Sequence, residues 1–285
     1  MTCRRRARVF DRAWTRRETP LETDTMQSEE ITPEMVEAFR EEGFIRIPQV
    51  ITPEEAAHYF DAATNTITRY RAEKTPSPES GYTDVDIFVQ IVNIWKEDET
   101  LRTLTCHPNV GRIAEKLAGS RMRLWHDHIL CKMPHNDAST EFHQDQPYWP
   151  HAECPHPVSA WIALCDVPVE RGCMTFLPGS HRKTDLAVQH LDDPRSLFTI
   201  CPELEYSPRV TMPLKAGDCT FHHGRCAHMA TPNFTDVARI AHVVIYMEEA
   251  TRYRKIRHIV TDPLDLEDGD PLDGPLFPAV ASMTS

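Results

Sequence analysis

The residues best suited to chemistry are two histidines and an aspartate in two separate segments of the chain. His143 and Asp145 are two positions apart in the run Phe-His-Gln-Asp, and His228 lies far downstream. On a β-strand, residues i and i+2 point to the same face, so the first pair could bind one ion together. Two imidazoles and one carboxylate are the ligand set of the facial triad, which holds non-heme Fe(II) and leaves positions open.

Arg239 adds a permanent cation to this set. It follows His228 by 11 residues (239 − 228) and begins a predicted strand. Its planar guanidinium suits a carboxylate. A 2-oxo acid chelating through its carboxylate and keto oxygen would fill two open positions of such an ion, and O₂ would fill the third.

Two other interpretations of the same residues remain open. Two histidines and a carboxylate also make a catalytic zinc site, so a zinc-dependent hydrolase is one alternative. The other is a non-catalytic, cupin-like binding protein that retains an ion site. Arg239 favours the oxygenase interpretation, because a hydrolase does not require it.

The elements that must position these residues change character along the chain. Helices are predicted at 32–43, 52–74 and 108–117, with a strand at 44–50 between the first two. After Arg121 short strands predominate, at 122–131, 158–167, 173–177, 210–214, 218–222 and 239–247. Helices followed by many strands indicate an α+β protein built on a barrel or jelly roll.

At this point the chain resembles the phytanoyl-CoA dioxygenase family of Fe(II)- and 2-oxoglutarate-dependent oxygenases. The resembling positions are the His-x-Asp at 143–145, Trp161, the runs 170–173 and 177–181, His228, Asn233 and Arg239. The likeness covers roughly residues 30–250. It implies a double-stranded β-helix (a cupin-like jelly roll) with N-terminal helices buttressing one sheet.

The resemblance also implies a role for each matching residue. His143, Asp145 and His228 would bind iron and carry the catalysis, and Arg239 would pair with the distal carboxylate of 2-oxoglutarate. Related halogenating enzymes lack the carboxylate ligand, so the aspartate favours hydroxylation over chlorination.

Two further positions match co-substrate contacts of the family. Trp161 would pack beside 2-oxoglutarate, and His128, on the preceding strand, would touch it. One position departs from the family: Ala230 stands where a hydroxyl residue is common, two residues after the distal histidine. Thr231 or water would have to replace that hydrogen bond, or co-substrate binding would be weaker.

Other residues near these motifs receive secondary assignments. Gln146, Tyr148 and Trp149 are predicted to contact the substrate. His222 and His223 are predicted to support the loop that leads to His228 rather than to bind metal. The sequence places three more histidines in proline-rich loops, where we expect solvent exposure: His135, His151 and His156.

Composition restricts the class of protein. A net charge of −12 argues against a nucleic-acid partner. No apolar run is long enough to span a bilayer, so no membrane partner is expected. The nine cysteines form no CxxC pair, which indicates reduced thiols in a cytoplasmic protein.

The predicted domain organisation has three parts. Residues 1–28, with seven arginines in the first 25, are expected to be a disordered tail, and Met26 is a candidate for the true start. Residues 29–260 form the dioxygenase domain, and residues 261–285 an irregular C-terminal tail. Within the domain, residues 181–208 lack periodicity and are predicted to be a loop that excludes water from the site.

The predicted activity is hydroxylation of an aliphatic carbon of a small molecule, with Fe(II), 2-oxoglutarate and O₂. A secondary metabolite or other small metabolite is favoured as the substrate. An acyl-CoA thioester is the alternative. No clear basic cluster for a CoA phosphate is present, since Arg182-Lys183 and the arginines at 252, 254 and 257 are scattered. The oligomeric state is not predicted.

Overall fold

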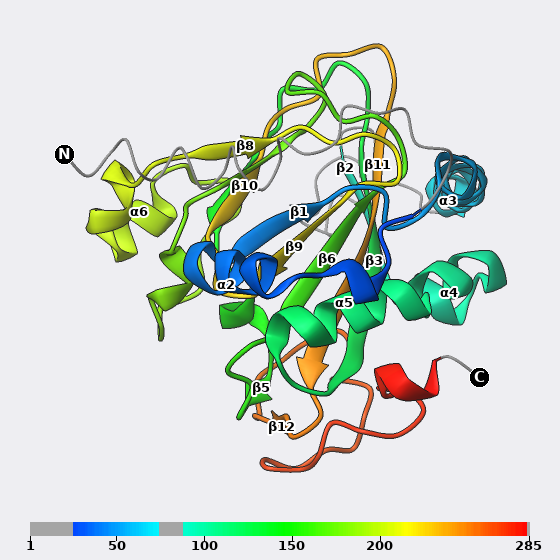
Figure 1. Cartoon of the computed structure of the whole chain (residues 1–285). Coiled ribbons are helices and arrows are strands. Elements are labelled where there is room, and N and C mark those ends of the chain that lie inside the picture. Colours follow the sequence, from blue (N-terminus) through cyan, green and yellow to red (C-terminus); the bar gives the residue numbers. More distant parts are fainter. Residues whose placement is uncertain (1–24, 74–87, 284–285) are drawn as a thin grey trace.

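A computed structural model describes residues 25–73 and 88–283 of the chain. Its largest sheet has six antiparallel strands in the order β1-β9-β6-β11-β3-β2. These are β1 (Phe44–Ile47), β2 (Phe88–Val92), β3 (Met122–Lys132), β6 (Val158–Ala163), β9 (Cys219–His223) and β11 (Arg239–Glu248). The two longest strands, β3 and β11, pair along their whole length (Figure 1), with β2 outside β3 and β6 on the other side of β11.

A second antiparallel sheet of four strands faces the first, in the order β4-β10-β7-β8. It contains β4 (Thr140–His143), β7 (Met174–Phe176), β8 (Val210–Met212) and β10 (His228–Ala230). One buried core lies between the sheets, where the rings of Phe44 and Phe176 stack with centroids 4.4 Å apart. A small third sheet pairs β5 (His151–Ala152) with β12 (Arg252–Tyr253).

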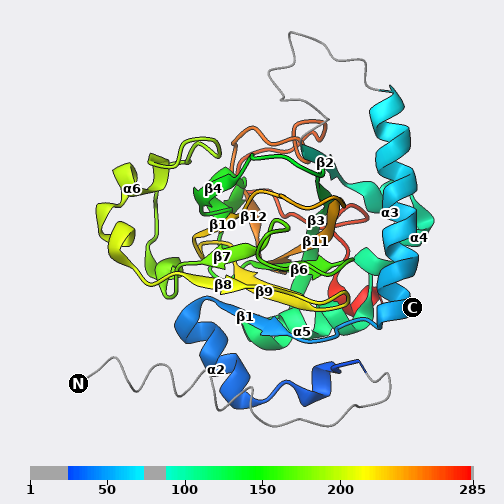
Figure 2. The ribbon, with the colours of Figure 1, turned by 90° about the horizontal axis from the view of Figure 1, so that it is seen from above.

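Helices cover the outer face of the six-stranded sheet (Figure 2). They are α2 (Pro33–Glu42), α3 (Pro53–Glu73), α4 (Glu99–Thr105) and α5 (Pro108–Ala118). Their ends follow the expected capping chemistry. Thr52 and Glu55 form a reciprocal capping box at the start of α3, and Gly43, with φ of 84°, ends α2. The apolar faces of these helices pack on the strands and make a second core.

The region at 181–208 differs from the prediction of a structureless loop. It contains the helix α6 (Ser196–Ile200) and the 3₁₀ turns Ser180–Arg182 and Pro202–Tyr206. Leu197, Phe198 and Leu204 are buried there, together with Phe142. The segment therefore has a small apolar core of its own, which holds it in place.

The C-terminal segment is irregular, as expected, yet it packs tightly on the domain. Leu272, Phe277 and Val280 are each at most 2% exposed. Residues 1–24, most of the predicted N-terminal tail, lie outside the described residues. Residue 26 belongs to the folded part, since the Met26 amide donates to the Gln49 carbonyl at 2.9 Å.

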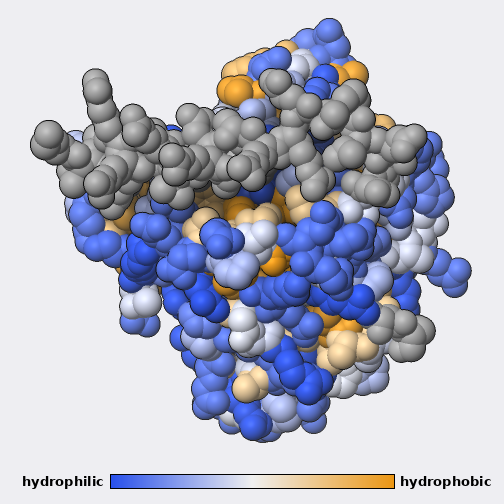
Figure 3. Space-filling model, in the orientation of Figure 1, coloured by the Kyte–Doolittle hydropathy of each residue, from blue (hydrophilic) through white to orange (hydrophobic). Residues whose placement is uncertain are grey.

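The surface facing the viewer in Figure 3 is mainly hydrophilic over the described residues, with small apolar patches between polar side chains. Among the described helices, none has the length and apolar character needed to cross a membrane.

Candidate metal centre

The two sheets bring His143 and His228 together. The histidines end β4 and begin β10, and they are direct antiparallel partners in the register of these strands. Their ring centroids are 4.4 Å apart. A residue pair far apart in sequence thus becomes a cross-strand pair, in which side chains on one face are close neighbours.

Asp145 reaches the same point by a different backbone conformation from the one predicted. The strand ends at His143, and Asp145 has φ of −73° and ψ of −43°, at the start of the 3₁₀ turn Gln146–Tyr148. The amide of Gln144 donates at this point to Oε1 of Gln189 at 2.8 Å. The expected extended His-x-Asp strand is therefore wrong, although its side chains still converge.

The three side chains could hold one metal ion. Asp145 Oδ1 lies 3.4 Å from His143 Nε2 and 3.8 Å from His228 Nε2. One ligand atom from each residue lies within 4.8 Å of the others. An ion bound to three such atoms at about 2.1 Å would bring neighbouring ligand atoms to roughly 3 Å, so a small contraction would complete the site.

The hydrogen bonds of both imidazoles fit a bound metal. Nδ1 of His143 lies 2.7 Å from the carbonyl of Glu141, and Nδ1 of His228 lies 3.0 Å from that of Cys226. Because a carbonyl only accepts, each Nδ1 carries the proton and each Nε2 presents a lone pair toward Asp145. Lone pairs facing a carboxylate repel unless a cation lies between them, and this Nδ1–carbonyl bond is a recurrent second partner of ligating histidines.

Electrostatics agree with that arrangement. Burial lowers the pKa of His228 to about 3, so its imidazole is neutral at neutral pH. Burial alone would raise the pKa of Asp145, but polar contacts with its neighbours, His222 among them, hold that pKa well below the ordinary value. A neutral histidine and an ionised aspartate are the protonation states that bind metals.

Arg239 lies in the same interior, at the start of β11. It is 1% exposed, its Nη1 donates to the Leu130 carbonyl at 3.0 Å, and its guanidinium lies 5.3 Å from the ring of Trp161. No carboxylate pairs with it among the described residues, and its Nε has no partner there. Burial lowers the pKa of Arg239 to about 10, which still leaves it charged at neutral pH. A buried, unpaired cation suits an anionic ligand.

Gly172 makes room for this guanidinium. Its φ is +68°, and a Cβ at this position would lie 3.0 Å from Nε of Arg239 and 3.2 Å from Cδ of Lys132. Thr231 does not replace the hydroxyl missing at Ala230, because its own hydroxyl donates to the carbonyls of Val169 and Cys173.

The predicted co-substrate contacts lie in one row across the sheet. His128 and Trp161 both pair with Val243, one on each side of β11. Nδ1 of His128 is 3.3 Å from Nε2 of Gln90, and burial lowers the pKa of His128 to about 4. Both side chains therefore face the interior that holds Arg239.

The predicted substrate contacts separate into two kinds. Tyr148 and Gln146 are partly exposed and anchored by hydrogen bonds, from the Tyr148 hydroxyl to Gln189 and from Arg225 to Gln146. Trp149 is 4% exposed and packs against Gly224, so we assign it to the core. His151, expected in solvent, is also buried, because it packs edge-on against Trp125.

Ser159 and His222 were not predicted as site residues, yet both contact Asp145. The Ser159 hydroxyl donates to Oδ2 at 3.3 Å, and Nε2 of His222 lies 3.4 Å from the same atom. The alternation of β9 gave the available signal, because it directs Thr220 and His222 to one face and Phe221 and His223 to the other.

Comparison with known proteins is consistent with this geometry. A family model described as phytanoyl-CoA dioxygenase matches residues 39–241. The chain belongs to the phytanoyl-CoA dioxygenase family. Phytanoyl-CoA dioxygenase domain-containing protein 1 of Mus musculus is 27% identical over 158 residues, which are 54% of each chain. The chain thus matches about half the length of this curated relative.

Two solved structures of enzymes from nogalamycin biosynthesis are similar to this family member over most of its length. The non-heme alpha ketoglutarate dependent carbocyclase SnoK is 35% identical, with a TM-score of 0.78 over 90% of this chain and 99% of its own. The epimerase SnoN, in complex with Fe³⁺, alpha ketoglutarate and nogalamycin RO, is 35% identical, with a TM-score of 0.74 over 86% and 96%. The family and these neighbours are iron- and 2-oxoglutarate-dependent oxygenases.

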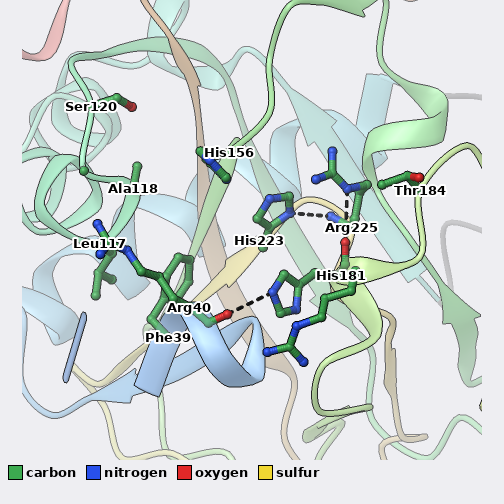
Figure 4. A pocket seen from close by; sticks show the side chains of 12 residues that line it. Phe39, Arg40, Leu117, Ala118, Ser120, His156, His181, Thr184, His223 and Arg225 are labelled. Carbon is green, nitrogen blue, oxygen red and sulfur yellow. Dashed lines mark hydrogen bonds between the residues drawn. The ribbon is translucent and has the colours of Figure 1, made fainter. Parts of the chain in front are cut away.

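The fold also contains a cavity of about 620 Å³. It lies on the side of β9 that faces away from the metal centre. Figure 4 shows His223 and His181 in its wall with Arg225 nearby. His223 accepts from the Arg225 amide at 3.0 Å and contacts the Pro155 carbonyl at 2.9 Å. His223 therefore supports the loop before His228, as predicted, while His222 points to the metal centre.

Proposed function

We propose that the protein is an Fe(II)- and 2-oxoglutarate-dependent dioxygenase that hydroxylates an aliphatic carbon of a small secondary metabolite. The observation that carries this proposal is a pair: a His-Asp-His group within 4.8 Å, and a buried arginine with no carboxylate partner among the described residues, in one interior. A zinc hydrolase would need the first feature but not the second.

In this proposal His143, Asp145 and His228 hold the iron. Arg239 binds the distal carboxylate of 2-oxoglutarate, with Trp161 packing beside it and His128 contacting the co-substrate. The two facing sheets are then the halves of a double-stranded β-helix, and residues 29–260 are the catalytic domain. Free thiols at the described cysteines suit a cytoplasmic location.

A bound iron ion and 2-oxo acid would supply the oxidising chemistry: one atom of O₂ would enter succinate as CO₂ leaves, and the other would become the hydroxyl of the product. The chain itself contributes position and environment. Arg239 orients the co-substrate carboxylate, Asp145 stays ionised, and the Nδ1–carbonyl bonds keep both imidazoles turned with Nε2 inward. The packed segment 181–208 borders the site and limits water around it.

A second outcome deserves a test because of the two solved structures described above. SnoK is described as a carbocyclase and SnoN as an epimerase, each 35% identical to this chain. Epimerisation would leave the mass of the substrate unchanged, and ring closure with loss of two hydrogens would lower it, so the mass of the product separates both outcomes from hydroxylation. An acyl-CoA substrate, suggested by the names of the curated relatives, is the alternative substrate class.

The test is succinate release by the purified, Fe(II)-loaded protein. We expect slow 2-oxoglutarate turnover without substrate and a marked increase with the correct small molecule, whose mass would rise by one oxygen. His143→Ala and Asp145→Ala proteins should lose this turnover. Full succinate production by either variant would contradict the proposal. A product of unchanged mass would favour epimerisation, and a product lighter by two hydrogens would favour ring closure.

A further inference from the structure

We propose that His222 and Ser159 are positioning residues for Asp145, holding one carboxylate oxygen so that the other faces the metal. This inference rests on the proposed function, because it assigns the arrangement of a ligand of that iron. It adds two residues that touch neither the predicted ion nor 2-oxoglutarate directly.

The two oxygens of Asp145 have different neighbours. Oδ1 faces the lone pairs of His143 and His228, at 3.4 and 3.8 Å. Oδ2 faces donors instead, the Ser159 hydroxyl at 3.3 Å and Nε2 of His222 at 3.4 Å. A carboxylate held in this way offers one oxygen to an ion and keeps the second in hydrogen bonds, which favours monodentate binding.

The sheet places these two donors side by side. Ser159 on β6 and His222 on β9 are direct antiparallel partners, so their side chains leave the same face at adjacent points. Both are buried, at 0% and 2% exposed. The His222 ring also packs against Phe176 and His228, with centroids 5.5 and 4.6 Å away. These two contacts restrict the rotation of the buried ring.

Asp145 needs such support because its backbone has left the strand. It lies beyond the end of β4 in a helical conformation, and its side chain is 23% exposed. His143 and His228 are held by strand pairing and by their carbonyl contacts, whereas the carboxylate can rotate about its own side-chain bonds. Hydrogen bonds to Oδ2 remove that freedom, and preorganised ligands bind metals more tightly.

His222 could instead be read as a fourth ligand. Its Nε2 is directed at Oδ2 of Asp145, however, and the group of ligand atoms within 4.8 Å of one another contains His143, Asp145 and His228 without it. With Nε2 donating, Nδ1 carries the lone pair, and it has no partner among the described residues. The imidazole thus acts here as a donor.

The experiment is a titration of the metal-free protein with Co(II) or Mn(II) under anaerobic conditions. His222→Leu and Ser159→Ala should each weaken metal binding about 10- to 100-fold, the usual effect of losing such a partner. His222→Gln retains an N–H donor at similar reach and should stay within a few-fold of the wild type. The Co(II) absorption spectrum of His222→Gln should match the wild type, since no ligand is lost.

Thr220→Val is the matched control. Thr220 lies two residues earlier on the same face of β9, is fully buried, and has a hydroxyl with no partner among the described residues. Its substitution should leave metal affinity unchanged. If His222→Leu fails to fold, as judged by circular dichroism, Ser159→Ala and His222→Gln still decide the matter.

The outcomes separate the inference from the function on which it rests. A wild-type protein that binds no divalent ion would remove the proposed function. If the wild type binds the metal and the Ser159→Ala and His222→Leu proteins bind it with the same affinity as the wild type, only this inference would be overturned. A changed Co(II) spectrum in His222→Gln would also overturn it, by making the imidazole a ligand.

Discussion

At the scale of single residues, the strongest chemical constraint is the buried guanidinium of Arg239. Removing a charge from water is costly unless a partner replaces the lost solvent. Here the described partners are a carbonyl and an aromatic face, which satisfy the cation only in part. The remaining donors form a planar fork, and a carboxylate matches that geometry with two parallel hydrogen bonds.

The first prediction follows from this geometry. Arg239→Lys keeps the charge but loses the fork, so we expect 2-oxoglutarate affinity to fall about 10- to 100-fold, from the loss of a charged hydrogen bond. Calorimetric titration of the Mn(II)-loaded protein without O₂ would measure it. Metal affinity should not change. Exposed Arg182 provides the control, since Arg182→Lys should bind 2-oxoglutarate normally, and equal affinity in both variants would contradict the assignment.

At the scale of elements, a buried polar network joins the helices to the six-stranded sheet. Asp127 on β3 accepts from the Thr105 hydroxyl of α4 at 2.6 Å and from the Trp95 amide at 3.1 Å, and it lies 3.5 Å from Nε2 of His242 on β11. The aspartate is 0% exposed, and burial raises its pKa to about 7. The network thus connects β3, β11, α4 and the 3₁₀ turn Ile94–Lys96 through Asp127.

The second prediction concerns the pH dependence of stability. The pKa of Asp127 is raised in the folded protein. Its protonation therefore contributes fully to the unfolding free energy below about pH 4, and this contribution is lost as pH rises toward 7. Asp127→Asn removes this term. As pH rises from 4 to 7, the unfolding free energy of the wild type should therefore fall relative to that of the variant, by at most roughly 4 kcal/mol.

Chemical denaturation of both proteins at several pH values would measure this difference. His242 lies in the same network, and burial lowers its pKa to about 3, so its imidazole is neutral throughout the range from pH 4 to pH 7. A difference between the two proteins that does not vary with pH would contradict the assignment to Asp127.

At the scale of the whole molecule, the C-terminal segment closes the end of the fold. Phe277 is 2% exposed and stacks on Trp125 of β3 with centroids 5.3 Å apart. The carbonyl of Pro278 accepts from the Leu124 amide at 3.0 Å, which continues the pairing of β3 into this segment. An irregular backbone can thus be as firmly packed as a strand.

The third prediction tests that packing. Phe277→Ala should lower the unfolding free energy by about 3–5 kcal/mol, because it removes a buried aromatic ring. Ile259→Ala is the control: this side chain is 69% exposed in the same C-terminal region, and its loss should cost within about 0.5 kcal/mol. Equal melting temperatures of the two variants would show that the segment is a dispensable tail.

The sequence alone determined the ligand chemistry and the local elements. Residue types and spacing predicted a metal site at the His-x-Asp pair and His228 with a carboxylate-binding cation at Arg239, and the family resemblance added iron and 2-oxoglutarate to that prediction. Capping residues likewise predicted α2 and α3, because Thr32, Gly43 and the Thr52–Glu55 pair act within a few residues of chain.

Tertiary structure alone decided what depends on contacts between distant segments. The helical turn at Asp145 is accompanied by the long-range Gln144–Gln189 hydrogen bond, and the proposed roles of Ser159 and His222 depend on the register of β6 against β9. Burial of His151 and Phe277 depends on which neighbours cover them. The residue type fixes the chemistry of each side chain, whereas register and burial depend on pairs of segments that come into contact only when the chain folds.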